Sequence, residues 1–222
     1  MSYTFLDQQN FLSTLLGDSN TSSDDMWPTA QRLTELNNGE LQFARDAKNL
    51  REYATGAVSG NQIAVPSDWL GTYSLILDDQ VITNSREISI NDWDRYYNYT
   101  GTPPYIYYWE FSGTRYIKIL GSATTYKLFY WKRPTTALSS DSDVSLHPEE
   151  YRKGPVYFAA AELLKQIGKH QESTIMMNYY GEYVTRANID VSRSYINKEY
   201  AQPDFGDGNL STTDTQGNGW NY

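Results

Sequence analysis

The chain has 222 residues, no cysteine and a formal net charge of −9 at pH 7. This length allows one substantial hydrophobic core, or one core with an added lobe, and the absence of cysteine excludes disulfides and thiolate chemistry. A protein that reads nucleic-acid sequence needs a basic face for the phosphates, so the acidic excess argues against that class. No signal peptide or apolar membrane span is recognisable, and we expect a soluble protein that acts without secretion or membrane contact.

The first 53 residues predict helices. Large apolar residues spaced three and four apart mark one face of a first helix, which Gly17 can end. After a polar turn-forming stretch, Trp27-Pro28 opens a second helix, with proline in the first turn. The run Asn37-Asn38-Gly39 interrupts its apolar stripe. We therefore expect a bend or two abutting helices there, with a second stretch over Glu40–Tyr53.

Residues 54–136 change to a β pattern. Fourteen of the 39 positions from 93 to 131 are aromatic, and short β-favouring runs alternate with glycine-containing turns. This pattern predicts an antiparallel meander. The rings fill and flank a small β core in one interpretation, and in the alternative they form a non-catalytic carbohydrate-binding surface on the Tyr/Trp-rich sheet. The expected strands cover residues 62–66, 73–77, 87–90, 105–111, 116–120 and 126–131.

Helical periodicity returns after a polar connector over residues 134–148. The best helix in the chain begins at Glu149 and ends at Gly168, and a second one begins near Gln171 with Ile175, Tyr179 and Tyr183 on one face. Because a β module is placed between helical ends, those ends are expected to pack on each other. The core positions expected there are Leu33, Leu36, Val156, Ala160, Leu163 and Ile167.

These patterns together predict an α+β fold. Residues 1–53 and 137–198 form one helical bundle, residues 54–136 form an inserted antiparallel β module, and residues 199–222 form a flexible, extended C-terminal arm. The arm contains four glycines and no basic residue, so it is not expected to fold alone. It is either a frayed terminus or a partner-binding segment anchored by its aromatic residues, which are Phe205, Trp220 and Tyr222.

No motif predicts catalysis, a cofactor or a metal. The only histidines, His147 and His170, do not belong to a ligand-spaced cluster. The run from Asp141 to Asp143 lacks the glycine and distal glutamate of a calcium loop. Nucleophile elbows, phosphate loops and dinucleotide fingerprints are also missing from the sequence. We therefore predict a protein without enzymatic activity, catalytic residues, cofactors or metal ligands.

A series of short motifs, in a fixed order, resembles the head-to-tail adaptors of tailed bacteriophages, also called connectors or head-completion proteins. These motifs run from a leading apolar helix, through a strand that ends in Lys-Arg-Pro, to an acidic link and an alanine-rich helix. The long β insertion leaves open a tail-side ring protein of the same virus. The matching segments are residues 5–16, 32–53, 63–69, 126–134, 138, 147–151 and 156–167.

The resemblance implies a structural protein of the virion neck, assembled in the host cytoplasm. Such adaptors form homo-oligomeric rings of about twelve copies, placed between the portal protein and the tail or nozzle proteins. Double-stranded DNA passes through the ring without specific binding and leaves through it during DNA ejection. The arm is similar to C-terminal arms that grip the portal, so its three aromatic anchors are expected to contact the portal or a neighbouring subunit.

The uneven charge fits a DNA channel. Residues 1–53 carry 4 basic and 8 acidic residues and residues 137–222 carry 7 and 12, whereas residues 54–136 carry 7 of each. The helical parts thus hold the whole negative excess, which can serve solubility alone or can repel phosphates along a channel. The candidate channel-lining acids are Glu162, Glu172, Glu182 and Asp190.

Overall fold

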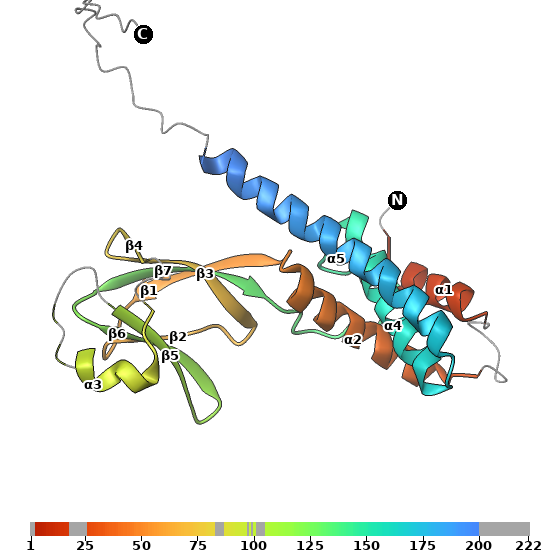
Figure 1. Cartoon of the computed structure of the whole chain (residues 1–222), viewed down its shortest axis with the longest axis horizontal. Helices are drawn as coiled ribbons and strands as arrows, with labels where there is room; N and C mark the ends of the chain where they lie inside the picture. Colours follow the sequence, from red (N-terminus) through yellow and green to blue (C-terminus); the bar gives the residue numbers. More distant parts are fainter. Residues whose placement is uncertain are drawn as a thin grey trace, which may run out of the picture.

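The computed structural model describes residues 3–17, 26–82, 87–96, 98, 100 and 105–199. Figure 1 shows an elongated molecule with a helical bundle at one end and a β module at the other. The fold is α+β, with the N- and C-terminal helices in one bundle and the antiparallel strands inserted between them, as predicted. The predicted C-terminal arm lies outside the described residues.

Helix α1 covers Phe5–Leu16 and has the predicted end. Thr4 and Asp7 form a capping box, in which each side chain accepts a hydrogen bond from the other residue's backbone N–H. At the C-terminus Gly17 adopts a left-handed conformation with φ 68°, which glycine reaches without strain. The first helix is therefore set by local sequence signals at both ends.

Helix α2 covers Thr29–Ala47 and is continuous through Asn37-Asn38-Gly39, so the alternative of two abutting helices is wrong. Gly39 faces helix α4, and a Cβ atom there would overlap the carbonyl oxygen of Pro155. The glycine thus permits close packing of two helices, which offsets its weak helix propensity. The second half of the prediction was also too long, because the helix ends at Ala47 and Tyr53 lies in a strand.

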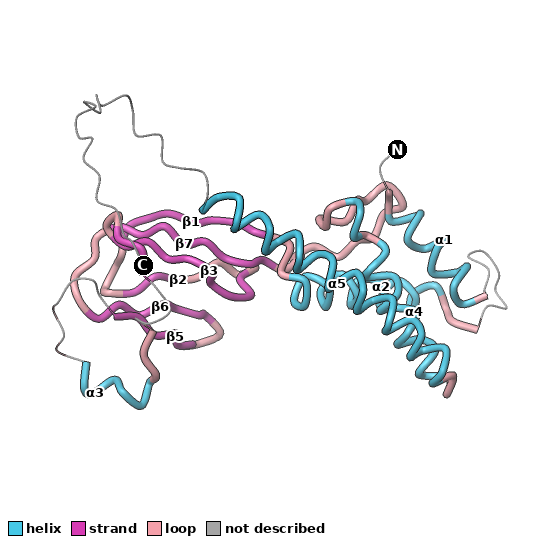
Figure 2. Tube along the Cα trace, turned by 45° about the horizontal axis from the view of Figure 1, so that its top comes forward, coloured by secondary structure: helices cyan, strands magenta, loops and turns pink. Residues whose placement is uncertain are grey.

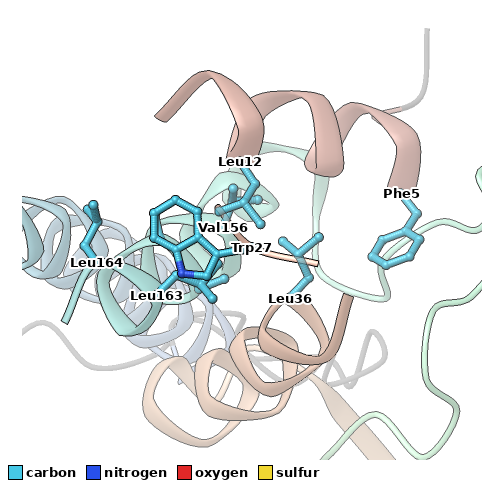
Figure 3. Packing of buried hydrophobic residues seen from close by; sticks show 9 residues of the cluster. Phe5, Leu12, Trp27, Leu36, Val156, Leu163 and Leu164 are labelled. Carbon is cyan, nitrogen blue, oxygen red and sulfur yellow. The ribbon is translucent and has the colours of Figure 1, made fainter. Parts of the chain in front are cut away.

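The C-terminal helices begin after a single 3-10 turn, η3, at Glu149–Tyr151. Helix α4 covers Lys153–Gln166 and helix α5 covers His170–Glu199, with Gly168 at φ 79° between them. Helix α4 is central, since it packs against α1, α2 and α5. The side chains of α1, α2 and α4 point toward one another in Figure 3. This core contains Phe5, Leu12, Trp27, Leu36, Val156, Ala159, Ala160, Leu163 and Leu164.

One position of the predicted bundle core is wrong, and the apolar face expected on the last helix is not its buried face. Ile167 is 39% exposed, because α4 ends there and the backbone turns away toward α5. On α5 the buried residues are Ser173, Tyr180 and Ala187, whereas Ile175 and Tyr179 are exposed. The apolar pattern was misleading because this helix packs through Ala187, the Ser173 hydroxyl and the Tyr180 phenol. The two hydroxyl groups have polar partners. Ser173 Oγ donates to the carbonyl oxygen of Ala161 at 2.9 Å, for example.

The β module contains two antiparallel sheets, with strand orders β1-β7-β3-β4 and β2-β6-β5. It is therefore not the predicted simple meander, because β7 lies between β1 and β3 rather than beside β6. Their inner faces meet in a second core made mainly of Ile, Leu and Tyr. The strands are β1 Arg51–Ala57, β2 Gln62–Ala64, β3 Trp69–Leu77, β4 Gln80–Ile82, β5 Tyr105–Phe111, β6 Thr114–Leu120 and β7 Thr125–Lys132.

The region between β4 and β5 differs from the prediction. The expected strand over residues 87–90 is reduced to one bridge between Glu87 and Ile106. It is followed by a 3-10 turn, η2, at Ile90–Asp92 and a short helix, α3, at Trp93–Tyr96. Strands β1 and β4, in contrast, were missed by the sequence prediction.

The chain enters and leaves the β module at one place. Strands β1 and β7 pair along their whole lengths, and Lys132 N donates to the carbonyl oxygen of Leu50 at 3.1 Å. Lys132 Nζ also lies 3.1 Å from Glu52 Oε2. Figure 2 shows the two strands side by side as they approach the helices. The first and last strands of the insertion therefore close it as a unit.

We predict that Gly39→Ala destabilises the protein by about 1–3 kcal/mol, because α2 and α4 must separate to admit the methyl group. Gly181→Ala is the matched control, since a Cβ at this α5 position meets no atom within 4 Å. That control should stabilise the helix by ~0.5–1 kcal/mol. Urea unfolding of the three proteins measures both effects, and equal midpoints for the two variants would contradict the packing role of Gly39.

Candidate interaction surfaces

The connector over residues 134–148 is held against the helical bundle. Asn37 on α2 binds Leu138 twice, with Leu138 N donating to its Oδ1 at 2.7 Å and its Nδ2 donating to the Leu138 carbonyl oxygen at 3.0 Å. Phe5 N at the start of α1 donates to the carbonyl oxygen of Asp143 at 2.8 Å. The connector is polar, as predicted, but it is a structural part of the bundle rather than a solvated link.

A buried polar network lies under this connector. Glu40, only 4% exposed, accepts hydrogen bonds from Ser145 Oγ at 2.6 Å and from Gln8 Nε2 at 2.8 Å. The fully buried His147 places Nε2 3.1 Å from the Glu40 carbonyl oxygen and Nδ1 3.0 Å from Asn49 Oδ1. Residues from α1, α2 and the connector thus share one network, which fixes the path of the chain between the β module and α4.

Burial lowers the pKa of His147, although the Glu40 carboxylate acts in the opposite direction and Arg152 adds to the lowering. Glu40 Oε2 lies 3.6 Å from His147 Nε2, too far for a hydrogen bond. Burial outweighs the carboxylate because the ring has no exposed surface. His147 is therefore neutral at pH 7, and it donates from one ring nitrogen only, since a neutral imidazole carries a single N–H.

We predict that stability falls as the pH drops below 6.5, the ordinary pKa of histidine. In that range the unfolded chain takes up a proton that the folded chain refuses, so protons favour the unfolded state. His147→Gln should reduce the slope of unfolding free energy between pH 7 and pH 5. His170→Gln, at an exposed position, is the control and should leave the slope unchanged. Chemical unfolding at pH 5, 6 and 7 gives both slopes, and identical slopes for wild type and His147→Gln would contradict the argument.

The structure places the four candidate channel acids on two helices. Glu162 on α4 lies 3.7 Å from Lys165 Nζ, and Glu172 on α5 lies 3.2 Å from Lys169 Nζ. Glu182 lies 3.8 Å from Arg186 on the next turn of α5. These local surface pairs are worth little energy, and their partners reduce the net negative charge of the helices.

Asp190 has a different role from the other three acids. Its carboxylate accepts a hydrogen bond from the Tyr151 hydroxyl, which ties α5 to the turn before α4. Burial and this bond raise the pKa of Tyr151 to about 12.

Glu172 and Asp190 are 18 residues apart and lie on the same side of the helix, with Glu182 about 80° away. Of the three α5 candidates, Asp190 is bonded to Tyr151, whereas Glu172 and Glu182 are exposed and pair only with nearby basic residues. The predicted arm anchors Phe205, Trp220 and Tyr222 lie outside the described residues.

The outer side of the β1-β7-β3 sheet carries a row of rings, called here the aromatic face. Its centre is Tyr53, Phe129, Tyr73 and Trp131, whose neighbouring centroids are 5.4–6.2 Å apart. The rings alternate along β7 with Leu128 and other inward residues, as the pleat requires. Sequence reasoning missed this surface because Tyr53 was assigned to a helix and β1 was not predicted.

Three cations stand over the aromatic face. Lys127 Nζ lies 5.2 Å from the Phe129 centroid, Lys48 Nζ lies 4.9 Å from that of Trp131, and the Arg51 guanidinium carbon lies 5.7 Å from that of Tyr73. Strands β1, β7 and β3 place no acidic side chain among these rings, since Glu52 alternates to the other side of β1. The face is therefore aromatic and basic on a chain with a net negative charge.

A second surface lies at the edge of the β2-β6-β5 sheet. Trp69, Tyr108, Trp109 and Tyr116 line a shallow cavity of about 290 Å³ together with Arg115. The Arg115 guanidinium lies 5.5 Å from the Trp69 centroid and forms a 3.4 Å ion pair with Glu110. A cation lies over the Trp69 ring here and over rings of the aromatic face, and neither surface has a feature specific to sugars.

The described residues were also compared with the requirements of a metal site and of a membrane-spanning helix. Within them, no group of three or more His, Asp or Glu side chains is arranged to hold a metal ion. Of the helices described, none combines the length and apolar character that crossing a bilayer requires.

Comparison with protein families matches most of the chain. The family model described as SU10 adaptor protein matches residues 3–202, a range that includes the helical bundle, the connector and the whole β module. A search among curated proteins finds no match. The matched range ends before Phe205, so it does not include the three predicted anchors Phe205, Trp220 and Tyr222.

Proposed function

The chain belongs to the SU10 adaptor protein family and is a bacteriophage adaptor, a structural protein of the virion, and we propose that it forms the ring that joins the portal to the tail. The observation that carries the proposal is the extent of the family match, which runs from the first helix through the β module to the end of α5. The adaptor family also favours a protein without enzymatic activity.

The shape of the subunit supports a joining role. Its hydrophobic clusters lie at opposite ends of an elongated molecule, two within the helices and one between the sheets. An adaptor needs separate surfaces for two neighbouring assemblies, and the helical end and the β end of this subunit can serve as those surfaces. In the proposed neck, about twelve copies surround the DNA channel, with the portal on one side and tail or nozzle proteins on the other. The ring assembles in the host cytoplasm.

We predict that the protein forms a closed ring on its portal. Native mass spectrometry and negative-stain imaging of the chain with purified portal should give a complex containing about twelve copies. Assembly on the portal distinguishes this role from that of a tail-side ring, the alternative left open by the β insertion. A chain that forms rings with tail proteins and none with the portal would contradict the proposal in favour of that alternative.

The acidic helices support a passive channel for DNA. In this proposal, the half-buried Glu162 of α4 and the exposed acids of α5 face the passing duplex and keep it from binding, because like charges repel at short range. The candidate residues remain Glu162, Glu172, Glu182 and Asp190. The proposal requires the isolated protein to bind duplex DNA weakly at physiological salt, since tight and salt-dependent binding marks a phosphate-contacting protein.

We predict that Glu172→Lys with Glu182→Lys slows DNA ejection while ring formation continues. Both side chains are exposed on α5, so the fold should tolerate the change, and each lysine adds attraction for phosphate. Glu87→Lys with Asp92→Lys is the matched control, because it changes the charge equally at exposed positions of the β module. Ejection can be followed by dye release from triggered particles. Equal rates for wild type and the α5 variant, or equal slowing by the control, would contradict the channel assignment.

A further inference from the structure

The aromatic face has an open end and a covered end. Arg51 Nη2 donates to the carbonyl oxygen of Val191 at 3.2 Å, so α5 crosses the face at its Arg51 end. At the other end Tyr53 is 59% exposed and Lys127 is also exposed. An exposed aromatic group ringed by cations is typical of a surface that binds an acidic, aromatic segment.

The chain itself contains a segment with this chemistry. Residues 200–222 hold three acidic residues and no basic one, and their aromatic residues include Phe205, Trp220 and Tyr222. The open part of the aromatic face holds two cations, Lys48 and Lys127, while Arg51 at the covered end lies near Glu150 and Asp190. The charges of segment and surface are therefore opposite and similar in number, and both carry large rings.

The segment begins at the end of α5, near the outer side of the sheet. From Val191 the helix continues for eight residues to Glu199, or about 12 Å. In both views its last turns extend away from the bundle toward the β module (Figures 1 and 2). The segment thus starts on the outer side of the sheet, and its 23 residues can span up to ~75 Å when extended. That length is enough to reach another copy of the chain.

We propose that residues 200–222 of one copy bind the aromatic face of the neighbouring copy, with Trp220 and Tyr222 as anchors beside Tyr53 and Phe129. The inference rests on the proposed ring, in which a head-to-tail contact gives every face one arm and closes after the last copy. A neighbour's arm is favoured over the chain's own, because α5 of the same copy already covers the near end of the face. An arm leaving that helix is directed outward, past its own sheet.

The test uses the full chain assembled on its portal. A photoreactive phenylalanine derivative replaces Tyr53, and unlabelled chains are mixed with ¹⁵N-labelled chains before assembly. Cross-links to residues 200–222 are then sorted by mass into those within one copy and those between copies. The same derivative at Leu146, which is 58% exposed on the connector, serves as the positional control. The proposal expects cross-links between copies from position 53 and none from position 146.

Charge variants test the chemistry of the contact. Lys48→Glu with Lys127→Glu should lower the cross-link yield about tenfold, since two attractive pairs become repulsive. Lys165→Glu with Lys169→Glu makes the same charge change on the bundle and should leave the yield unchanged. Trp220→Ala with Tyr222→Ala should lower the yield at least as much as the change in the face. Equal yields from the face variant and its control would overturn the proposal.

The outcomes separate this inference from the proposed function. Cross-links only within one copy, or only to the portal or to DNA, would overturn the contact between copies while the ring persists. A ring that forms normally without cross-links from position 53 would do the same. Failure of the unmodified chain to form any ring on its portal would instead overturn the proposed function and, with it, this contact.

Discussion

The close approach of α2 and α4 is the constraint on which the rest of the molecule depends. Gly39 lies against the carbonyl group of Pro155, and Gly154 lies against the ring of Phe43, so neither site has room for a side chain. This contact joins residues from opposite ends of the sequence. Once they are joined, the intervening chain must leave and return at one place, and the β module becomes an insertion closed by the pairing of β1 with β7.

The buried polar network follows from that closure. The connector must pass back over the bundle to reach α4, and its backbone groups need partners once they are covered. Asn37 supplies them for Leu138, and Ser145 Oγ, itself bound to Glu40, accepts a hydrogen bond from His147 N. A neutral histidine suits this position because a charged ring would have to be kept from water beside a single carboxylate. The same residues that order the connector thus make the bundle sensitive to acid.

Local features of the fold could be predicted from the sequence, and long-range ones could not. Gly17 and Gly168 ended helices as expected, and the strands at 105–111, 116–120 and 126–131 are present because their alternation is a local signal. The continuity of α2 was missed because its cause, Pro155, lies more than a hundred residues away in the sequence. The order of the strands was missed for the same reason, since β7 pairs with the first strand of the module rather than with its predecessor. The aromatic face could not be predicted without strand β1 and without the position of β7 between β1 and β3.

An adaptor between two assemblies must hold its two binding surfaces in a fixed relative orientation. The clusters within the helices do not merge with the cluster between the sheets, so their relative position is set by the bonds at the junction. Lys132 N binds the Leu50 carbonyl oxygen, and Arg51 reaches from β1 to the backbone of α5 at Val191. Arg51 therefore belongs both to the aromatic face and to the contact between the lobes. A segment bound to that face would rest against the side chain that holds the β module to α5, and so its binding would restrict movement of one lobe relative to the other.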